Sequence, residues 1–286
     1  MNPDSSLEIR ALLEERGLAL KKRWGQNFLI NRRARERLVS LLAPRPGETV
    51  WEIGPGLGAM TALLLEVSAK LLAFEVDRGL CRFLSESFAD RASFHLVPGD
   101  FVETWRDSLA VNGRPDRILG NLPYRSASLL IADIVEGGIR PLSMVFTVQR
   151  ELADRIASRP GRKSYSSFSV LCQSCFSVVN RGDLQPGSFW PVPEVVSSIV
   201  EMRPRADAPD ARTLRVLSLL VRGLFVSRRK TIRNNLEGES FKGVFSAEIA
   251  REALVRAGID PGQRAEQIPP DVFVQLAREL RESASP

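Results

Sequence analysis

The sequence predicts an α/β protein with a mainly parallel sheet, followed by a small domain made only of helices. Short apolar runs between residues 49 and 202 alternate with helical segments, and this alternation gives parallel strands with helices on both faces. A polar, proline-containing break at residues 203–209 is typical of a linker, and the pattern beyond it is helical. We therefore expect a sheet domain at residues 1–206 and a helical domain at residues 207–286, which a chain of 286 residues can support.

The N-terminal segment, residues 1–30, is expected to form a helix and an arm. Ser5 or Ser6 can cap an amphipathic helix that ends near Gly17. Residues 21–30 then combine a basic cluster with polar and aromatic side chains. This arm either packs onto the sheet domain or covers a ligand as a lid, and Asn31 behind it can cap an arginine-rich helix.

The sheet domain is predicted to contain seven strands. The strand candidates are residues 49–53, 71–76, 93–97, 117–119, 144–148, 176–180 and 198–202, and the helical segments recognised between them are residues 58–67, 78–88 and 126–135. No helical segment separates the last two strands, so an antiparallel hairpin is expected at that end of the sheet. The helices expected in the C-terminal domain are residues 214–225, 231–236, 247–257 and 270–280.

Charge and cysteine content narrow the class of protein. The chain has 40 Lys and Arg against 34 Asp and Glu, which mildly favours a polyanionic partner. Cys81, Cys172 and Cys175 do not make a disulfide framework, and no second cysteine pair completes a zinc site. The sequence has neither a signal peptide pattern nor an apolar run of membrane-spanning length. We expect a cytoplasmic protein that binds no metal and no membrane.

A glycine loop follows the first strand of the alternating region. Gly54 and Gly56 stand between a strand and a helix, where glycines allow a tight turn and a close approach to a ligand. The second strand ends at Glu75, the position at which an acid holds ribose hydroxyls in nucleotide-binding folds. The third strand is followed by Asp100 and Phe101, which suit the amino group and the ring of an adenine.

The charge around this loop favours a cationic ligand. Glu52 precedes the glycines, and a carboxylate there repels a pyrophosphate but attracts a sulfonium or an ammonium group. The Gly-Lys-Ser/Thr sequence of a phosphate cradle does not follow. The set therefore suits S-adenosylmethionine better than NAD or ATP. The alternative is that Glu75 and Asp100 only cap the ends of their strands.

The fourth strand runs into a corner formed by Asn121, Leu122, Pro123 and Tyr124. Pro123 stops regular structure and biases Leu122 toward an extended backbone. The corner thus holds an amide, a carbonyl and an aromatic ring in fixed relation, which suits a flat, hydrogen-bonding nucleobase. Taken alone, the segment is equally consistent with an ordinary strand end that buries a tyrosine.

In combination these motifs resemble a known family. Glu52–Gly58, Glu75, Asp100 and Asn121–Tyr124 look like the successive motifs of class I, Rossmann-like methyltransferases that act on adenine N6. The arm ending in Gly25-Gln-Asn-Phe-Leu29 is similar to that of the ribosomal RNA adenine dimethyltransferases. Two later segments, residues 189–197 and 225–236, agree with this family. The second is similar to a segment of its small-subunit branch, the kasugamycin-resistance dimethyltransferases. The resemblance extends from about residue 21 to residue 280.

The resemblance implies a cofactor and a substrate. It implies that S-adenosylmethionine is contacted by Asn27, Leu29, Gly54, Glu75, Asp100 and Asn121. The glycine loop and the segment after the third strand add Gly56 and Phe101 as expected cofactor contacts. It implies that two adjacent adenines in a hairpin loop near the 3′ end of 16S rRNA each receive two methyl groups. The substrate would be a pre-30S particle, which gives the protein a role in small-subunit biogenesis. We expect a monomer.

The expected chemistry depends on the corner. The Asn121 Oδ1 atom and the Leu122 carbonyl are candidates to accept hydrogen bonds from the N6 amino group and so aim its lone pair at the methyl donor. Tyr124 would stack on one face of the base and Phe189 on the other, unless Phe189 is a core aromatic residue. The candidate phosphate contacts are Lys21, Lys22, Arg23, Arg228, Arg229, Lys230 and Arg233.

The chain departs from the family pattern at a few positions. Arg125 follows Tyr124 where the family usually has Asn, Ser126-Ala127 replaces Ile-Ser, and Ser166 stands where Gly is common.

Two other functions stay open. One is methylation of a 23S rRNA adenine, as in macrolide resistance, against which the segment 225–236 argues. The other is a non-catalytic ribosome-assembly or RNA-binding factor on the same fold.

Overall fold

The computed structural model describes residues 2–20, 25–67 and 70–283. The chain divides into two compact units. The first comprises Met1–Ile131, Pro141–Ala153 and Val179–Arg203, and the second comprises Ala132–Arg140, Asp154–Val178 and Pro204–Pro286. The second unit therefore includes two segments from the middle of the chain in addition to the C-terminal residues.

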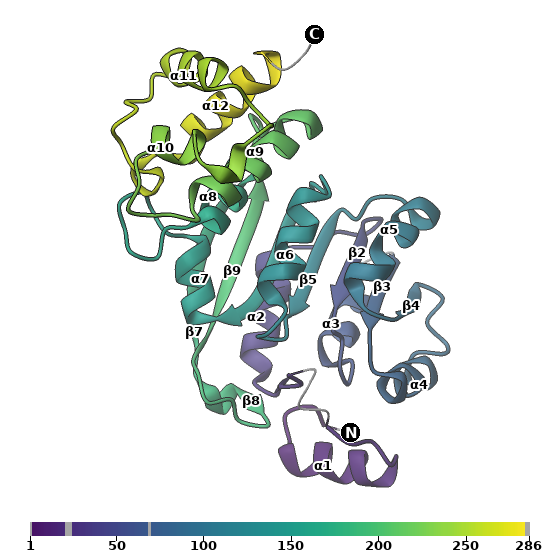
Figure 1. The fold of residues 1–286 in the computed structure, drawn as a ribbon. Coiled ribbons are helices and arrows are strands. Elements are labelled where there is room, and N and C mark those ends of the chain that lie inside the picture. The colour runs from purple at the N-terminus through teal and green to yellow at the C-terminus, as the bar shows by residue number, and fades with distance from the viewer. Residues whose placement is uncertain (1, 21–24, 68–69, 284–286) are drawn as a thin grey trace. The chain divides into compact units, whose positions relative to one another are not determined.

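Seven strands form one sheet in the order β4-β3-β2-β5-β6-β9-β7 (Figure 1). Neighbouring strands from β4 to β6 are parallel, and β9 is antiparallel to β6. The strands are β2 (Thr49–Ile53), β3 (Lys70–Glu75), β4 (Phe94–Pro98), β5 (Arg117–Asn121), β6 (Ser143–Gln149), β7 (Phe176–Leu184) and β9 (Ser197–Pro204). The α/β class and the seven predicted strands are confirmed.

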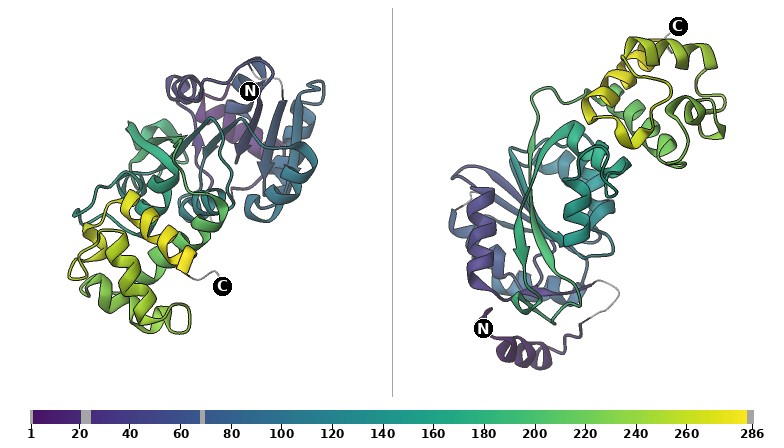
Figure 2. Two further views of the ribbon diagram at one scale, coloured as in Figure 1. Left: turned by 90° about the horizontal axis from the view of Figure 1, so that it is seen from above. Right: turned by 90° about the vertical axis from the view of Figure 1, so that its left-hand side faces the viewer.

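Helices cover the sheet. The helices of the first part of the chain are α1 (Ser6–Glu15), α2 (Arg32–Leu42), α3 (Ala59–Val67), α4 (Arg78–Ser87), α5 (Phe101–Asn112), α6 (Ala127–Glu136) and α7 (Arg150–Ile156). Ser5 and Asn31 cap α1 and α2, as predicted. Helix α2 runs along one face of the sheet (Figure 2) and packs with α3 through Leu38, Leu42 and Leu64. Helix α5, which was not predicted, lies in front of the sheet in Figure 1.

The parallel register brings the ends of several strands to one edge. Ile53 on β2 pairs with Phe74 on β3 and with Gly120 on β5, and Asn121 pairs with Thr147 on β6. Parallel strands present their carboxyl ends at the same edge of a sheet, where ligands bind in open α/β folds. The glycine loop, the acids after β3 and β4, and the corner after β5 therefore meet there.

A second, two-stranded sheet fixes the N-terminal arm. Strand β1 (Phe28–Leu29) pairs antiparallel with β8 (Phe189–Trp190), with Phe28 opposite Trp190 and Leu29 opposite Phe189. Their aromatic rings Phe28 and Trp190 stack with centroids 6.4 Å apart. A small apolar cluster that includes Ile9 and Leu13 of α1 packs against them. The arm is thus anchored by residues about 160 positions further along the chain.

The second unit contains a group of packed helices. They are α8 (Ser167–Cys175), α9 (Ala211–Leu224), α10 (Ile232–Leu236), α11 (Ala247–Arg256) and α12 (Pro270–Ser283), of which α8 was not predicted. Asp210 caps α9, and Leu217, Leu220 and Leu224 of that helix are fully buried. Tyr165 is also buried and donates a hydrogen bond of 2.8 Å to the Ile268 carbonyl.

The described part of the chain has neither a membrane-spanning helix nor a cluster of metal ligands. No helix there is long and apolar enough to span a bilayer. No group of three or more His, Cys, Asp or Glu side chains that could hold a metal ion occurs among the described residues. Cys172 and Cys175 are buried free thiols of α8, and burial raises the pKa of both.

Candidate active site

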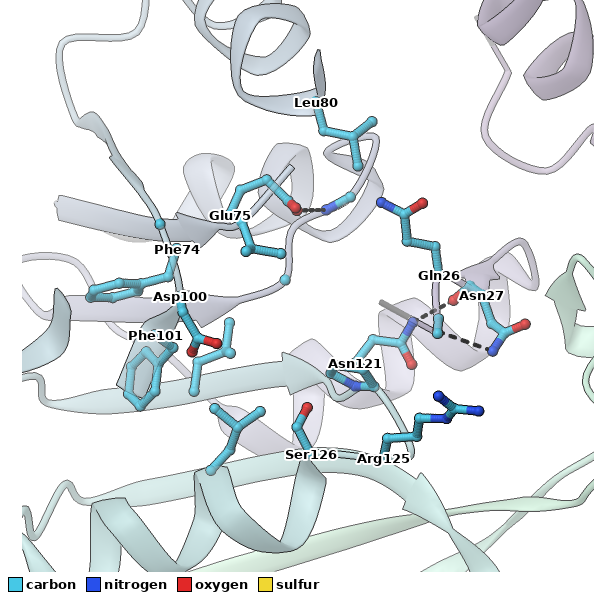
Figure 3. Close-up of a pocket in the computed structure, with 18 of the residues that line it drawn as sticks. Gln26, Asn27, Phe74, Glu75, Leu80, Asp100, Phe101, Asn121, Arg125 and Ser126 are labelled. Carbon is cyan, nitrogen blue, oxygen red and sulfur yellow. Dashed lines mark hydrogen bonds between the residues drawn. The ribbon is translucent and has the colours of Figure 1, made fainter. Parts of the chain in front are cut away.

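A pocket of about 290 Å³ lies at the carboxyl edge of the sheet (Figure 3). Its lining comes from the arm, the glycine loop, the ends of β3 and β4, and the corner after β5. Seven of the predicted cofactor residues line it, namely Asn27, Gly54, Gly56, Glu75, Asp100, Phe101 and Asn121. Segments that are far apart in sequence therefore converge on one cavity whose volume is near the lower end for small-molecule sites.

The glycine loop approaches the arm closely. Gly56 has a φ of 60°, and a Cβ atom there would lie 3.0 Å from the ring of Phe28. Its N–H donates a 3.2 Å hydrogen bond to Glu75 Oε2. A side chain at this position would meet both a strained backbone and the arm, so glycine is required for the turn.

Glu75 joins the glycine loop to the end of β3. Its side chain is 5% exposed and accepts hydrogen bonds from Gly56 N and, at 2.9 Å, from Asp77 N. Burial raises the pKa of Glu75 to about 7, the backbone N–H groups of Asp77 and Gly56 oppose that rise, and the Asp77 charge adds to it. Each carboxylate oxygen accepts one of these backbone hydrogen bonds and keeps a further acceptor site for a ligand.

Glu52 lies beneath the loop rather than in the pocket. It is fully buried on β2, and Thr61 Oγ1 on α3 donates a 2.7 Å hydrogen bond to its Oε2. The other oxygen, Oε1, has no hydrogen-bond partner among the described residues. Burial raises the pKa of Glu52 to about 7, which the Thr61 hydrogen bond opposes and the nearby Glu75 carboxylate supports. Glu52 can therefore act on a ligand through its charge but makes no direct contact.

Asp100 and Phe101 stand where β4 passes into α5. Asp100 caps the helix by accepting a 2.9 Å hydrogen bond at Oδ1 from Val102 N, and no described residue donates to its Oδ2. The ring of Phe101 is 4% exposed and packs edge-on against Trp51 and Phe74. Cap and aromatic cluster together fix one wall of the pocket and leave a carboxylate oxygen for a ligand.

The corner after β5 is held from two sides. Asn121 Nδ2 donates a 2.7 Å hydrogen bond to the carbonyl of Asn27 on the arm, and Thr147 Oγ1 donates to Asn121 Oδ1. Leu122 is 1% exposed, and its N–H donates a 3.1 Å hydrogen bond to the Thr147 carbonyl. A Cβ atom at Gly120 would lie 2.7 Å from Leu122 Cδ2 and 3.2 Å from the Ile53 carbonyl oxygen, so a side chain there would displace Leu122. The corner is stiff, as predicted.

The two predicted stacking rings differ in accessibility. Tyr124 is half-buried, its hydroxyl lies 2.6 Å from Ser197 Oγ, and burial raises the pKa of its phenol. Phe189 is 1% exposed and packs in the core among Leu29, Leu38 and other apolar side chains. Neither ring lines the described pocket. Phe189 is therefore a core aromatic residue in this structure, which was the alternative to a stacking role. To stack on a base, its ring would have to leave the core.

Leu29 also lies outside the main pocket. Its side chain is in the core, and its carbonyl accepts a 2.7 Å hydrogen bond from Arg35. It lines a smaller neighbouring cavity that shares Gly54, Gly56 and Asn121 with the main pocket. A contact between Leu29 and a ligand in the main pocket stays a prediction.

Three residues of the site were given no role from the sequence alone. Gln26 lines the pocket and donates a 3.4 Å hydrogen bond to Asp77 Oδ2. The exposed Arg125 lines the opposite part of the pocket, below Asn121 in Figure 3. Thr147 reaches the corner only through strand pairing. Of these, Arg125 was noted only as a departure from the family pattern.

The predicted basic residues fall into three groups. Lys21, Lys22 and Arg23 lie outside the described residues. Arg228 is engaged within the protein, because it forms a 2.7 Å ion pair with Glu266 and donates to the Lys163 carbonyl. The third group, Arg229, Lys230 and Arg233, is exposed and forms no ion pair with the described residues.

Known proteins match this chain over almost its whole length. The family model described as ribosomal RNA adenine dimethylase matches residues 17–282. A ribosomal RNA small subunit methyltransferase A from Treponema denticola is 41% identical over 269 residues, covering 93% of this chain and 92% of the relative. The protein of the same name from Borreliella burgdorferi is 36% identical over 280 residues, covering 98% of this chain and 95% of the relative.

Solved structures show the same fold. A dimethyladenosine transferase from Plasmodium falciparum has a TM-score of 0.74 at 20% identity, covering 86% of this chain and 94% of the other. The 23S rRNA methyltransferase ErmE has a TM-score of 0.64 at 23% identity, covering 89% and 99%. The class I methyltransferase fold is thus confirmed, as is the resemblance stated from the motifs. The chain belongs to the ribosomal RNA adenine dimethylase family.

Proposed function

We propose that this methyltransferase dimethylates the N6 amino groups of two adjacent adenines in the 3′-terminal hairpin loop of 16S rRNA, within a pre-30S particle. One observation carries the proposal. The Asn121 amide, fixed at the end of β5, lines the same pocket as the carboxylates Glu75 and Asp100. A base-reading amide and a nucleoside-binding pair of acids are thus within one cavity. The names of the relatives and their coverage support the 16S rRNA substrate.

The pocket fits S-adenosylmethionine by the chemistry of its lining. Glu75 can accept hydrogen bonds from two ribose hydroxyls, and Asp100 Oδ2 can accept one from the adenine amino group. The arm residues Gln26 and Asn27 close the end of the pocket near Asn121. The carboxyl groups of Glu52, Glu75 and Asp100 surround the site, and each of them that is ionised favours a sulfonium cation. Bound there, the cofactor supplies an electrophilic methyl group, and no metal ion is needed.

The corner would activate the adenine nitrogen by orientation. The N6 lone pair is delocalised into the purine ring and is a poor nucleophile. Hydrogen bonds from N6 to Asn121 Oδ1 and to the Leu122 carbonyl would make the nitrogen pyramidal and aim its lone pair at the methyl group, an alignment that removes several kcal/mol of barrier. In such a transfer the N6 lone pair would form the new N–C bond, the electron pair of the broken C–S bond would remain with sulfur, and the N6 proton would pass to water.

Stacking and phosphate contacts would hold the RNA. Tyr124, tethered by its hydroxyl to Ser197, can stack on the extruded base, which contributes roughly 1–3 kcal/mol in single-strand binders. In the helical unit, Arg229, Lys230 and Arg233 can contact phosphates because they are exposed and form no ion pair with the described residues. We assign particle binding mainly to this unit, and we propose that the protein acts as a monomer in the cytoplasm.

Transfer of a labelled methyl group tests the proposal. Purified protein and labelled S-adenosylmethionine are incubated with 30S particles from cells that lack these methyl groups, and the modified adenines are mapped. We expect label on two adjacent 16S adenines, with N6,N6-dimethyladenine as the final product. Label on a 23S adenine instead supports the macrolide-resistance type of reaction, and particle binding without transfer supports a non-catalytic assembly factor.

Replacing Asn121 tests the role of the corner. Asn121→Ala should reduce transfer at least 100-fold while particle binding stays within about twofold, because the lost contacts act on N6 alignment. Asn112→Ala is the matched control, since Asn112 accepts a hydrogen bond from Lys70 at the far end of α5. Full activity in Asn121→Ala would refute the assigned role.

A further inference from the structure

Thr147 on β6 contacts the corner twice. The strand register places it directly opposite Asn121. Its hydroxyl donates a hydrogen bond to Asn121 Oδ1, and its carbonyl accepts the Leu122 N–H at 3.1 Å. Its side chain is 1% exposed, so water does not compete for these contacts. One buried residue therefore contacts the Asn121 amide oxygen and the backbone N–H of Leu122, the residue whose carbonyl is the other acceptor assigned to N6.

The orientation of the Asn121 amide follows from the chemistry of its partners. The Asn27 carbonyl can only accept a hydrogen bond, so the amide nitrogen must face the arm. The amide oxygen must then face Thr147, whose hydroxyl acts as the donor. An amide oxygen has two lone pairs, and Thr147 uses one of them. The second remains for a substrate N–H.

We propose that Thr147 is a positioning residue for N6 methylation, an inference that rests on the function proposed above. Its hydroxyl fixes the Asn121 side chain at the oxygen end, while Asn27 fixes it at the nitrogen end. Without the hydroxyl, the amide keeps one anchor and can rotate about its terminal torsion, which has a broad energy profile. The remaining lone pair is then no longer held toward N6, and fewer bound bases are aligned for transfer.

The second methyl transfer should depend on Thr147 more than the first. An unmodified adenine N6 carries two hydrogens and can bond both Asn121 Oδ1 and the Leu122 carbonyl. N6-methyladenine carries one hydrogen and can bond only one acceptor at a time. Misalignment of either acceptor therefore affects the monomethylated base more strongly, and the intermediate accumulates.

Two substitutions at Thr147 separate the hydroxyl from the packing. Thr147→Val keeps the branched shape and removes the donor, whereas Thr147→Ser keeps the donor. Ser143→Ala is the matched control, because Ser143 is a buried hydroxyl on the same strand without a hydrogen-bond partner in the described structure. All three are compared with wild-type protein in transfer to unmethylated 30S particles, with single-turnover conditions for the rate and the product ratio and steady-state conditions for the KM.

We expect Thr147→Val to lower the transfer rate by about three- to tenfold, the range for losing one buried hydrogen bond. The KM for particles should stay within about twofold. At equal total methyl incorporation, Thr147→Val should show a higher ratio of monomethyl- to dimethyladenine. A loss of folded protein alone does not change that ratio at matched incorporation. Thr147→Ser and Ser143→Ala should match wild type in rate and ratio.

The outcomes separate this inference from the proposed function. If wild-type protein methylates 16S adenines and Thr147→Val keeps the wild-type rate and product ratio, the positioning role is wrong. It is equally wrong if Thr147→Ser is as slow as Thr147→Val, because the hydroxyl then does not account for the effect. If wild-type protein transfers no methyl group to either adenine, the proposed function itself fails.

Discussion

Replacing Glu52 by Gln removes a carboxylate that lies fully buried under the glycine loop. One of its oxygens accepts from Thr61, and the other has no partner among the described residues. Burial raises the pKa of Glu52 from 4.5 to about 7. The folded protein therefore holds a proton there at pH values at which the unfolded chain has released it.

This proton determines how stability changes with pH. Between the unfolded pKa and the folded pKa, the folded state binds more protons, so the free energy of unfolding falls as pH rises. About one pH unit above the folded pKa of about 7, both states are ionised and the Glu52 contribution no longer changes. For these two pKa values, the loss between pH 5 and pH 8 is about 2–3 kcal/mol.

Denaturant unfolding at several pH values measures the effect. We expect the free energy of unfolding of Glu52→Gln, relative to wild type, to change by about 2–3 kcal/mol in favour of the variant from pH 5 to pH 8. The buried Gln amide can also change the free energy of unfolding by an amount that does not depend on pH. Because only the difference between pH values is compared, that amount cancels. A part of the wild-type slope should remain in the variant, because burial also raises the pKa of Glu75 to about 7.

Glu48→Gln is a control, because the fold lowers the pKa of Glu48, whereas it raises the pKa of Glu52. A hydrogen bond from Arg117 is the main cause that lowers the pKa of Glu48, so this carboxylate is ionised in both states above pH 5. Its removal should destabilise the protein without changing the pH slope in the measured window. A wild-type slope that persists unchanged in Glu52→Gln would refute the assignment of the proton to Glu52.

Two further predictions concern exposed arginines. Arg229→Ala and Arg233→Ala should each weaken particle binding and reduce the magnitude of the slope of log affinity against log salt by about 1. Arg256→Ala is the control, because Arg256 forms ion pairs with Glu252 and Glu279, and it should leave the slope unchanged. Equal slopes for all three variants would exclude phosphate contacts at the first two. Arg125→Ala should raise the KM for particles more than the dissociation constant for S-adenosylmethionine; the reverse order, measured by calorimetry, would place Arg125 on the cofactor.

Local sequence patterns predicted the parts of the fold that depend on local signals. Strands β2, β3 and β5 are short apolar runs buried on nearly every residue, so their bounds were within two residues of the prediction. The glycine loop and the acids after β3 and β4 were recognisable because each follows such a run. Helix α8 was missed because its sequence, rich in Ser and Cys with no charged residue, lacks an amphipathic pattern.

Features that depend on distant contacts could not be read from the sequence. The pairing of β1 with β8 and the contact of Thr147 with Asn121 arise from register between separate segments. The burial of Phe189 follows from that pairing, because it places the residue beside Leu29 in the core. The motif suggested an accessible ring, but a motif does not specify how deeply its side chains are packed.

The pairing of β1 with β8 has a consequence for the order in which the protein matures during synthesis. Strand β1 precedes its partner by about 160 residues. A growing chain can therefore assemble β2 to β6 while the arm still has no strand to pair with, since domains fold from the N-terminus during translation. The arm carbonyl that binds Asn121 becomes fixed only after Phe189 and Trp190 emerge. A nascent chain shorter than this has the parallel strands β2 to β6 but neither β9 nor the closed pocket.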